Sequence, residues 1–198
     1  VVGRRSWGKQ QPPLGAQVMS GHPLARGLVV CLPLNEGGGA TVRNLAGRTV
    51  NGTLTNGPVW VPDRFGLGVS FDGVNDHIAV PWPAALNFAA SAPRTISLWH
   101  KKTGAGGGDF PRLTSFGVNG AGWELANAGP SGSTNIHYYD GAWNDTGADG
   151  AIVTGEWNHI VHTFDGATVK VYKNAVEVHS AASGGRAAQD NLEIGNRE

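Results

Sequence analysis

The strongest constraint on the fold is a stretch near the C-terminus in which alternating residues are interrupted by tight turns. In residues 157–164 successive side chains fall on opposite faces, with the two-residue period of a β-strand, and both faces are partly apolar. Asp165-Gly166 is typical of a hairpin turn, and 168–172 repeats the strand pattern. A second turn at Lys173-Asn174 leads to a further strand at 176–178. The sequence therefore predicts an antiparallel meander here.

Further short β-like runs recur along the chain and are separated by clusters of Gly, Asn and Asp. They are predicted at residues 69–71, 77–80, 95–100, 113–118, 123–126, 136–139 and 192–194. With 31 Gly and 11 Pro among 198 residues, the composition suits many tight turns and disfavours long helices. This length is sufficient for one all-β sandwich of two antiparallel sheets around a single core.

Residues 1–26 differ from the remainder and are predicted to form an extended N-terminal arm. They show neither hydrophobic period and contain no acidic residue. Their basic residues are Arg4, Arg5, Lys9 and Arg26. The arm is therefore formally +4 and residues 27–198 are −4, because the whole chain is neutral. Two interpretations stay open: an arm that contacts an acidic surface of a neighbouring protein chain, or a solvated flexible terminus.

Composition also argues against several classes of function. Fifteen basic and fifteen acidic residues leave no overall charge for specific nucleic-acid binding. No apolar stretch of about 20 residues occurs, so membrane insertion is not expected. The start of the chain lacks Met and the apolar segment of a signal peptide, so export is not expected to be encoded in this form. The single cysteine, Cys31, excludes an intrachain disulfide and is predicted to be a small buried hydrophobe.

Six segments, in the same order, resemble the bacterial and phage form of the laminin-G-like family, within the concanavalin A-like lectin/glucanase superfamily. They are residues 27–39, 51–58, 71–78, 95–99, 155–161 and 192–195. The motifs include Phe71-Asp72-Gly73 with Asp76, Gly155-Glu156-Trp157 with His159, and Leu192-Glu193-Ile194-Gly195. The resemblance implies a jelly-roll sandwich of the concanavalin A type over residues 27–198.

The C-terminal end departs from the family pattern. In the family, a segment like 192–195 is normally followed by a closing strand that lies beside the opening strand, whereas this chain stops at Glu198. Two interpretations stay open. Either segment 28–34 exposes a free sheet edge that pairs with another protein chain, or the sequence is a truncated form.

Catalytic chemistry is not predicted. Related sandwiches include glycoside hydrolases whose acids lie in an E-x-D-x-x-E pattern on one strand, where proximity separates their pKa values. The nearest counterpart here, Glu156-Trp157-Asn158, has an amide in the middle position, and Glu124 stands alone in its strand. His159 and His162 are three residues apart and point to opposite faces of a strand, so they do not form a zinc pair. We therefore predict that the chain is not an enzyme.

Calcium is the metal that the resemblance implies, because family members often bind it through loop carboxylates and carbonyls. Asp72, Asn75 and Asp76 supply oxygen ligands within one turn and are the candidate metal residues. The alternative is that they are ordinary turn formers, whose side chains hydrogen-bond to their own backbone.

A sugar site needs an aromatic ring and polar groups that fix hydroxyls. The best local cluster is Tyr139, Asp140, Trp143 and Asn144, which is predicted to bind a ligand from a loop tip. The alternative is that Trp143 only covers a hairpin. Trp99 and Trp157 lie in strong strand patterns, and both are predicted to be core residues.

The predicted function is a non-enzymatic structural or adhesion component of a surface assembly, such as a decoration or tail-associated protein of a phage virion. Its partners would be other protein chains, reached through the arm and the free sheet edge. The phage origin rests on the resemblance, especially at residues 22–28. The alternative is a carbohydrate-binding module of a larger secreted bacterial protein, with glycans as partners. The expected location is the virion surface or the extracellular space.

Overall fold

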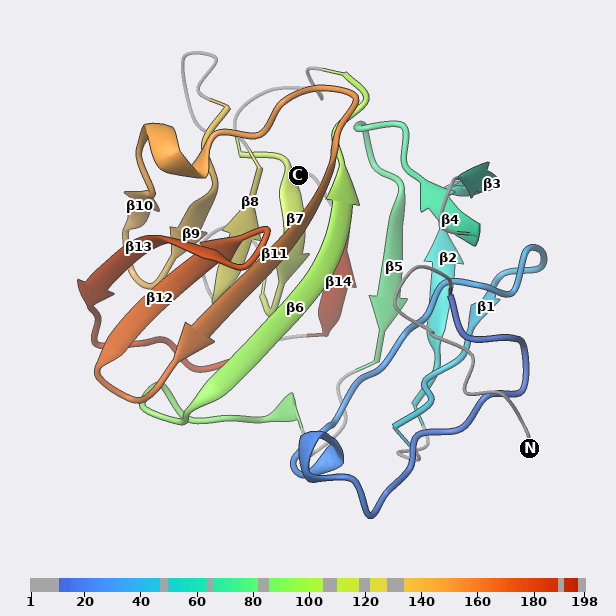
Figure 1. Cartoon of the computed structure of the whole chain (residues 1–198), viewed down its shortest axis with the longest axis horizontal. Helices are drawn as coiled ribbons and strands as arrows, with labels where there is room; N and C mark the ends of the chain where they lie inside the picture. The colour runs from blue at the N-terminus through green and yellow to red at the C-terminus, as the bar shows by residue number, and fades with distance from the viewer. Residues whose placement is uncertain are drawn as a thin grey trace, which may run out of the picture.

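The computed structural model of the chain describes residues 11–46, 50–63, 66–81, 86–104, 110–117, 122–127, 134–188 and 191–195. These residues are almost entirely β or loop (Figure 1). The strands are β1 (Thr41–Val42), β2 (Gly52–Thr55), β3 (Val59–Asp63), β4 (Gly66–Ser70), β5 (His77–Val80), β6 (Arg94–Lys101), β7 (Arg112–Ser115), β8 (Glu124–Ala126), β9 (His137–Tyr139), β10 (Trp143–Asp145), β11 (Trp157–Phe164), β12 (Thr168–Lys173), β13 (Val176–Ala182) and β14 (Leu192–Ile194). Short 3-10 helices include η1 (Pro23–Ala25) and η4 (Ala148–Gly150). In the described part of the chain, no helix is long and apolar enough to cross a membrane.

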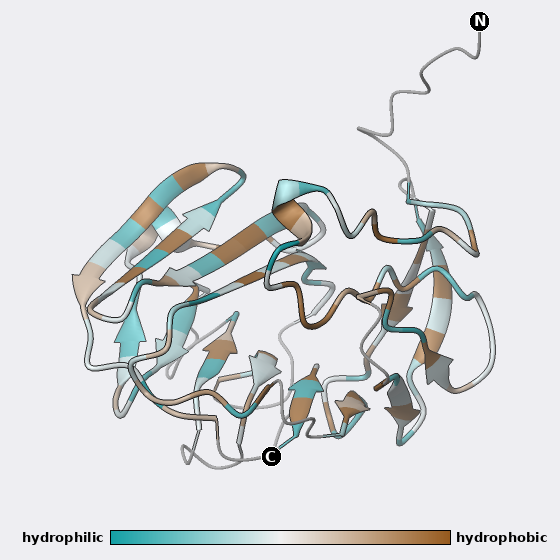
Figure 2. Cartoon of the chain, turned by 90° about the horizontal axis from the view of Figure 1, so that it is seen from below, coloured by the Kyte–Doolittle hydropathy of each residue, from teal (hydrophilic) through white to brown (hydrophobic). Residues whose placement is uncertain are grey.

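Two antiparallel sheets form the body. The large sheet has the strand order β1-β2-β5-β14-β7-β8-β9-β10, and the small sheet has the order β13-β12-β11-β6. Figure 2 shows them from below as two separate layers. The hairpin β3–β4 forms a third, two-stranded sheet. The predicted all-β sandwich and its meander are confirmed, and the predicted strands 77–80, 157–164 and 192–194 have the bounds of β5, β11 and β14.

The core lies between the two sheets. Along β11, residues at even positions are buried and those at odd positions are half-buried, so the strand turns one face to the interior. Ile160 and Phe164 belong to one apolar cluster with Leu125 and Tyr138 of the large sheet. Burial of side chains of this size stabilises the fold by about 1.5–3 kcal/mol each, and this packing holds the layers together.

Polar groups also lie in the core. His162 is fully buried, its ring centroid is 4.4 Å from that of Trp123, and among the described residues neither ring nitrogen has a hydrogen-bond partner. Burial, assisted by the charge of Arg94, lowers the pKa of His162 to about 3. The guanidinium of Arg94 lies over the rings of Phe88 and Phe164, at 4.9 and 4.6 Å from their centroids. The interior therefore favours neutral His162 beside a cation held by aromatic rings.

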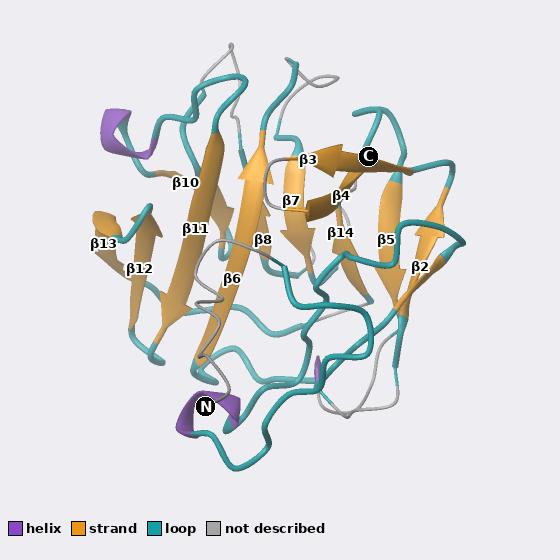
Figure 3. Cartoon of the chain, turned by 45° about the vertical axis from the view of Figure 1, so that its right-hand side comes forward, coloured by secondary structure: helices purple, strands orange, loops and turns teal. Residues whose placement is uncertain are grey.

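Segment 28–34 contains no regular strand, although it resembles the opening strand of the family, and Figures 1 and 3 draw it as a loop. The predicted free sheet edge at this segment is therefore wrong, because the segment belongs to no sheet of the described residues. The side chain of Asn44 fixes this segment by two hydrogen bonds: its Oδ1 accepts from Cys31 N at 2.9 Å, and its Nδ2 donates to Val29 O at 3.1 Å. Leu45 N also donates to Cys31 O at 2.9 Å. Cys31 is partly rather than fully buried, and this burial raises the pKa of its thiol.

Among the described strands, β6 forms one end of the small sheet and pairs with β11 alone (Figure 3). Its inward-facing Ile96 and Leu98 are half-buried, whereas their partners His162 and Ile160 on β11 are fully buried. The burial of inward-facing side chains therefore decreases toward this edge of the small sheet. An eight-residue strand paired on one side leaves backbone donors and acceptors of its other side available for another strand.

The described part of the predicted arm, 11–26, contacts the body at one end. The Gln11 amide donates to Pro33 O at 3.0 Å and accepts from Leu67 N at 2.7 Å. Asn35 Nδ2 donates to Pro12 O at 2.5 Å. These bonds tie the arm to the hairpin β3–β4 and to the segment after residue 32. The basic residues at positions 4, 5 and 9 lie outside the described residues.

Candidate functional site

The residues predicted to bind a ligand lie on the hairpin β9–β10, but the structure divides them between its two faces. Tyr139 and Trp143 are directly opposite in the register, and their ring centroids are 5.4 Å apart. Asn144 is paired with the buried Tyr138, so it faces the other way. Its amide donates to Asp140 Oδ1 at 2.9 Å, and Ser183 Oγ donates to the same carboxylate. The four residues therefore do not form a single cluster.

Neighbouring side chains cover the two aromatic rings. The ring of Phe110 stacks on that of Trp143, with centroids 3.9 Å apart and an angle of 8° between the planes. Arg112 lies 5.5 Å from the Trp143 ring, and Arg186 lies 5.3 Å from the Tyr139 ring. We call the group formed by Phe110, Arg112, Glu124, Tyr139 and Trp143 the Trp143 surface. Its rings already have contacts within the chain.

A buried ion pair supports the Trp143 surface. Glu124 is fully buried on the face of β8 that also carries Tyr139 of β9, and Arg112 Nε donates to its carboxylate at 2.6 Å. A carboxylate in this position needs its cationic partner, because an unpaired charge in the interior is costly. The pair therefore fixes Arg112 against the Trp143 ring.

The candidate calcium residues form a turn that closes by its own hydrogen bonds. Asp72 Oδ1 accepts from Val74 N at 2.8 Å and from Asn75 N at 3.3 Å, and these backbone bonds lower the pKa of Asp72. Asp76 Oδ2 accepts from Asp72 N at 3.0 Å. Among the described residues no group of three or more His, Cys, Asp or Glu is arranged to hold a metal. The carboxylates fit a turn better than a cation, and calcium binding stays a prediction.

A second aromatic surface lies on the outer face of the small sheet. Trp99 on β6 points away from Ile96 and Leu98 and is 59% exposed. Its predicted place in the core is therefore wrong. The period of β6 correctly put Trp99 opposite Ile96 and Leu98, but it did not show which face is turned inward. Trp157 shares the outer face and is half-buried, so it also lies outside the core cluster.

Two polar residues accompany Trp99. His159 is its direct partner on β11, with ring centroids 5.0 Å apart and an angle of 26° between the planes. Ser97 Oγ lies 2.8 Å from His159 Nε2. His159 N donates to Asn174 Oδ1 at 2.9 Å, which joins the strand to the next turn. Sequence reasoning missed this group, although the odd-numbered positions of both strands share the face of Trp99.

Two ion pairs lie on the same outer face. Lys101 Nζ donates to Asp63 Oδ2 at 2.8 Å, and Trp157 Nε1 donates to Asp63 Oδ1 at 2.8 Å. Further across the sheet, Lys170 donates to Glu177 at 2.9 Å. We call the group formed by Ser97, Trp99, Lys101, Trp157 and His159 the Trp99 surface. Lys101 and Lys170 each have an acidic partner, so these two pairs add no net charge to the face.

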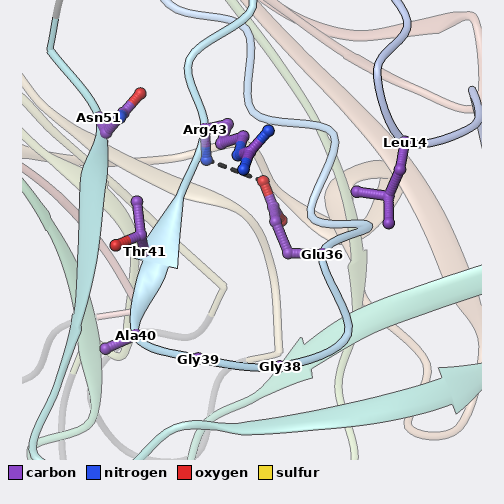
Figure 4. A pocket seen from close by; sticks show the side chains of 8 residues that line it. All are labelled: Leu14, Glu36, Gly38, Gly39, Ala40, Thr41, Arg43 and Asn51. Atoms are coloured by element: carbon purple, nitrogen blue, oxygen red, sulfur yellow. Dashed lines mark hydrogen bonds between the residues drawn. The ribbon is translucent and has the colours of Figure 1, made fainter.

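A cleft of about 640 Å³ opens at the other end of the molecule, beside the arm. Figure 4 shows that Leu14 of the arm and Glu36 lie around it together with Arg43. Glu36 Oε1 accepts from Arg43 N at 2.8 Å. Much of the remaining lining is small or backbone, from Gly38 to Thr41, and none of the described lining residues supplies an aromatic ring for stacking.

The sequence profile of the concanavalin A-like lectin/glucanases superfamily, in its laminin-G-like form, matches residues 71–198, more than half of the chain. The chain belongs to this superfamily. The match confirms the resemblance over that range, whereas the segments 27–39 and 51–58 precede it. A comparison with curated protein sequences finds no match.

Solved structures with the same fold include one domain of an arabinanase and two toxin binding domains. Domain 4 of AbnA, a GH43 extracellular arabinanase from Geobacillus stearothermophilus in complex with arabinotriose, is 20% identical, has a TM-score of 0.55, and aligns over 74% of this chain and 73% of that chain. The binding domain of Paraclostridial Mosquitocidal Protein 1 is 20% identical, with a TM-score of 0.66 over 88% of this chain and 46% of that chain. The botulinum neurotoxin serotype D binding domain is 14% identical, with a TM-score of 0.59 over 86% of this chain and 44% of that chain. This superfamily member spans less than half of the two toxin domains, and the likeness shows the fold alone.

Proposed function

We propose that this superfamily member is a non-enzymatic glycan-binding module that serves adhesion, either within a larger secreted protein or on a surface assembly. The observation that carries the proposal is the Trp99 surface, where a large aromatic side chain is left 59% exposed on the outer face of a lectin-like sandwich. An aromatic ring on a rigid strand offers an apolar plate to the apolar face of a sugar ring. The location that fits this role is extracellular or on a virion surface.

The arrangement of the acids supports a role without catalysis. Glu193, Ser115 and Glu124 lie in one row across the large sheet, so two acids share a face. Glycoside hydrolysis needs both carboxyl groups at the sugar and its attacking water or nucleophile. Glu124 is fully buried and bonded to Arg112, which makes it unsuitable as a catalytic acid or base.

A glycan array followed by calorimetry tests the proposal. The array carries neutral polysaccharides, arabino-oligosaccharides and acidic glycans, and the purified chain is applied at micromolar concentration. Reproducible binding without release of reducing sugar is expected. A blank array, together with no calorimetric signal for the same glycans at millimolar concentration, would overturn glycan binding.

A structural role in an assembly, such as a phage virion, is the second candidate function. The outer edge of β6 favours it, because this eight-residue strand pairs with β11 alone among the described strands and can accept a strand from a neighbouring chain. The basic arm adds charge that suits an acidic neighbour.

Hydrogen exchange distinguishes this second role. The amides of β6 should exchange more slowly within the native particle than in the isolated chain, whereas those of the central strand β11 should be equally protected in both. Equal exchange of β6 in both states, with light scattering showing a monomer at all concentrations, would refute pairing at this edge.

A further inference from the structure

We infer that Trp99, His159 and Ser97 form the saccharide subsite of this chain, that it takes neutral sugars, and that Tyr139 and Trp143 do not form it. This inference rests on the proposed glycan-binding function and assigns it to one face of the molecule. It reverses the expectation from sequence, which placed the ligand on the hairpin β9–β10.

Exposure distinguishes the two aromatic groups. Trp99 is 59% exposed and stands on an eight-residue strand, so the position of its ring is fixed by the sheet. Trp143 is packed against Phe110 at 3.9 Å, a distance that leaves no room for a sugar between the rings. A sugar on the face of Trp143 that Phe110 covers would first have to break this stack, whereas 59% of the Trp99 side chain is already exposed to solvent.

Hydrogen-bonding groups lie beside the exposed ring. Ser97 and His159 are joined at 2.8 Å, and a hydroxyl that makes one such bond still has capacity for a second partner. The ring of His159 lies 5.0 Å from that of Trp99, so the pair borders the plate on which the sugar would stack. An apolar plate with polar groups at its border is the arrangement that orients a sugar ring through both its apolar face and its hydroxyls.

The charges around the Trp99 surface indicate the class of sugar. Lys101 is bonded to Asp63, and Lys170 is bonded to Glu177, so neither cation lacks a carboxylate. An acidic sugar would have to compete with these carboxylates for the lysines. A neutral saccharide leaves both pairs intact and loses no charge solvation, which favours neutral ligands.

Four variants and the wild-type chain test the inference on the same array and by calorimetry. Trp99→Ala should weaken binding of neutral glycans roughly tenfold or more, Trp99→Phe should retain part of the affinity, and Ser97→Ala should weaken it several-fold. Trp143→Ala is the matched control and should bind within roughly twofold of the wild type. Circular dichroism spectra that match the wild type establish that each variant is folded.

The outcomes separate the inference from the proposed function. Wild-type binding that persists in Trp99→Ala, or that is lost in a folded Trp143→Ala, overturns the subsite and leaves glycan binding in place. Preference for acidic over neutral glycans overturns the class of sugar. Absence of any binding by the wild type overturns the proposed function itself.

Discussion

The Trp143 surface and the Trp99 surface each contain a tryptophan with aromatic and polar neighbours, but the first tryptophan is covered and the second is exposed. On the Trp143 surface, Phe110 and Arg112 pack on the indole, and the buried Glu124 holds Arg112 in place. On the Trp99 surface, the indole has a histidine beside it and remains 59% exposed. The rings of the Trp143 surface are covered by contacts within the chain, whereas the Trp99 surface leaves a large apolar area exposed to solvent.

The difference shows that the identity of an aromatic residue does not define a binding site. A tryptophan that is covered by its own chain contributes to stability, because its apolar area is already removed from water. An exposed tryptophan contributes little to stability and keeps that area for a ligand. The comparison predicts that perturbing the Trp143 surface costs free energy of unfolding, whereas perturbing the Trp99 surface costs binding.

The largest expected effect is a loss of stability at low pH, which we attribute to the inward-facing His162 of β11 and not to the outward-facing His159. The pKa of His162 is about 3 in the folded chain, well below the ordinary value of 6.5, so below pH 6.5 the unfolded chain binds more protons. Stability is therefore full above about pH 6.5 and falls as the pH drops toward 3, by up to roughly 4 kcal/mol. His162→Phe should flatten this decline in urea unfolding measured between pH 3 and 7.

His159→Phe is the matched control, because His159 lies on the same strand but faces outward. It should keep the acid dependence of the wild type. His100, whose pKa burial lowers to about 4, should preserve a part of the decline in His162→Phe. An unchanged acid slope in His162→Phe would contradict the assignment of the buried proton site.

The second effect concerns the support of the Trp143 surface. Arg112→Ala leaves Glu124 buried without its cation, and the free energy of unfolding should fall by about 3 kcal/mol. Lys170→Ala breaks the exposed pair with Glu177 and should leave stability unchanged within error. Urea unfolding at neutral pH measures both, and equal losses in the two variants would show that burial does not distinguish the pairs.

The smallest effect compares the two tryptophans directly. Trp143→Ala removes an indole that is stacked on Phe110 and should lower the free energy of unfolding by about 2 kcal/mol. Trp99→Ala removes an exposed ring and should cost less than about 0.5 kcal/mol. Thermal unfolding of the two variants checks the ranking, and a greater loss in Trp99→Ala would reverse the roles assigned to the surfaces.

The sequence predicted the strands better than the faces. The two-residue period of 157–164 and the Asp165-Gly166 turn were sufficient to predict β11 and β12, because alternation and turn chemistry are local. Trp99 was assigned to the wrong side because both faces of a strand in this sheet carry apolar residues. The choice between them depends on which side the large sheet covers, and that is a long-range property.

The candidate site shows the same limit. Tyr139 and Trp143 were correctly identified as neighbours, but the register of β9 and β10 places Asn144 beside the inward-facing Tyr138. Phe110 is distant in the sequence, so no local pattern reveals that it covers Trp143. Likewise, Ser97 and His159 are 62 positions apart and meet only because β6 pairs with β11.

The position of Trp99 on the last strand of its sheet has a mechanical consequence for an adhesion module. Force on a glycan held at Trp99 would enter the protein through β6, which in the described part of the chain has backbone pairing with β11 alone. Under tension, the backbone hydrogen bonds between such an edge strand and its neighbour are expected to break one after another. Asp63 accepts hydrogen bonds from Lys101 at the end of β6 and from Trp157 at the start of β11. This carboxylate therefore links the two strands, and we expect it to oppose their separation under force.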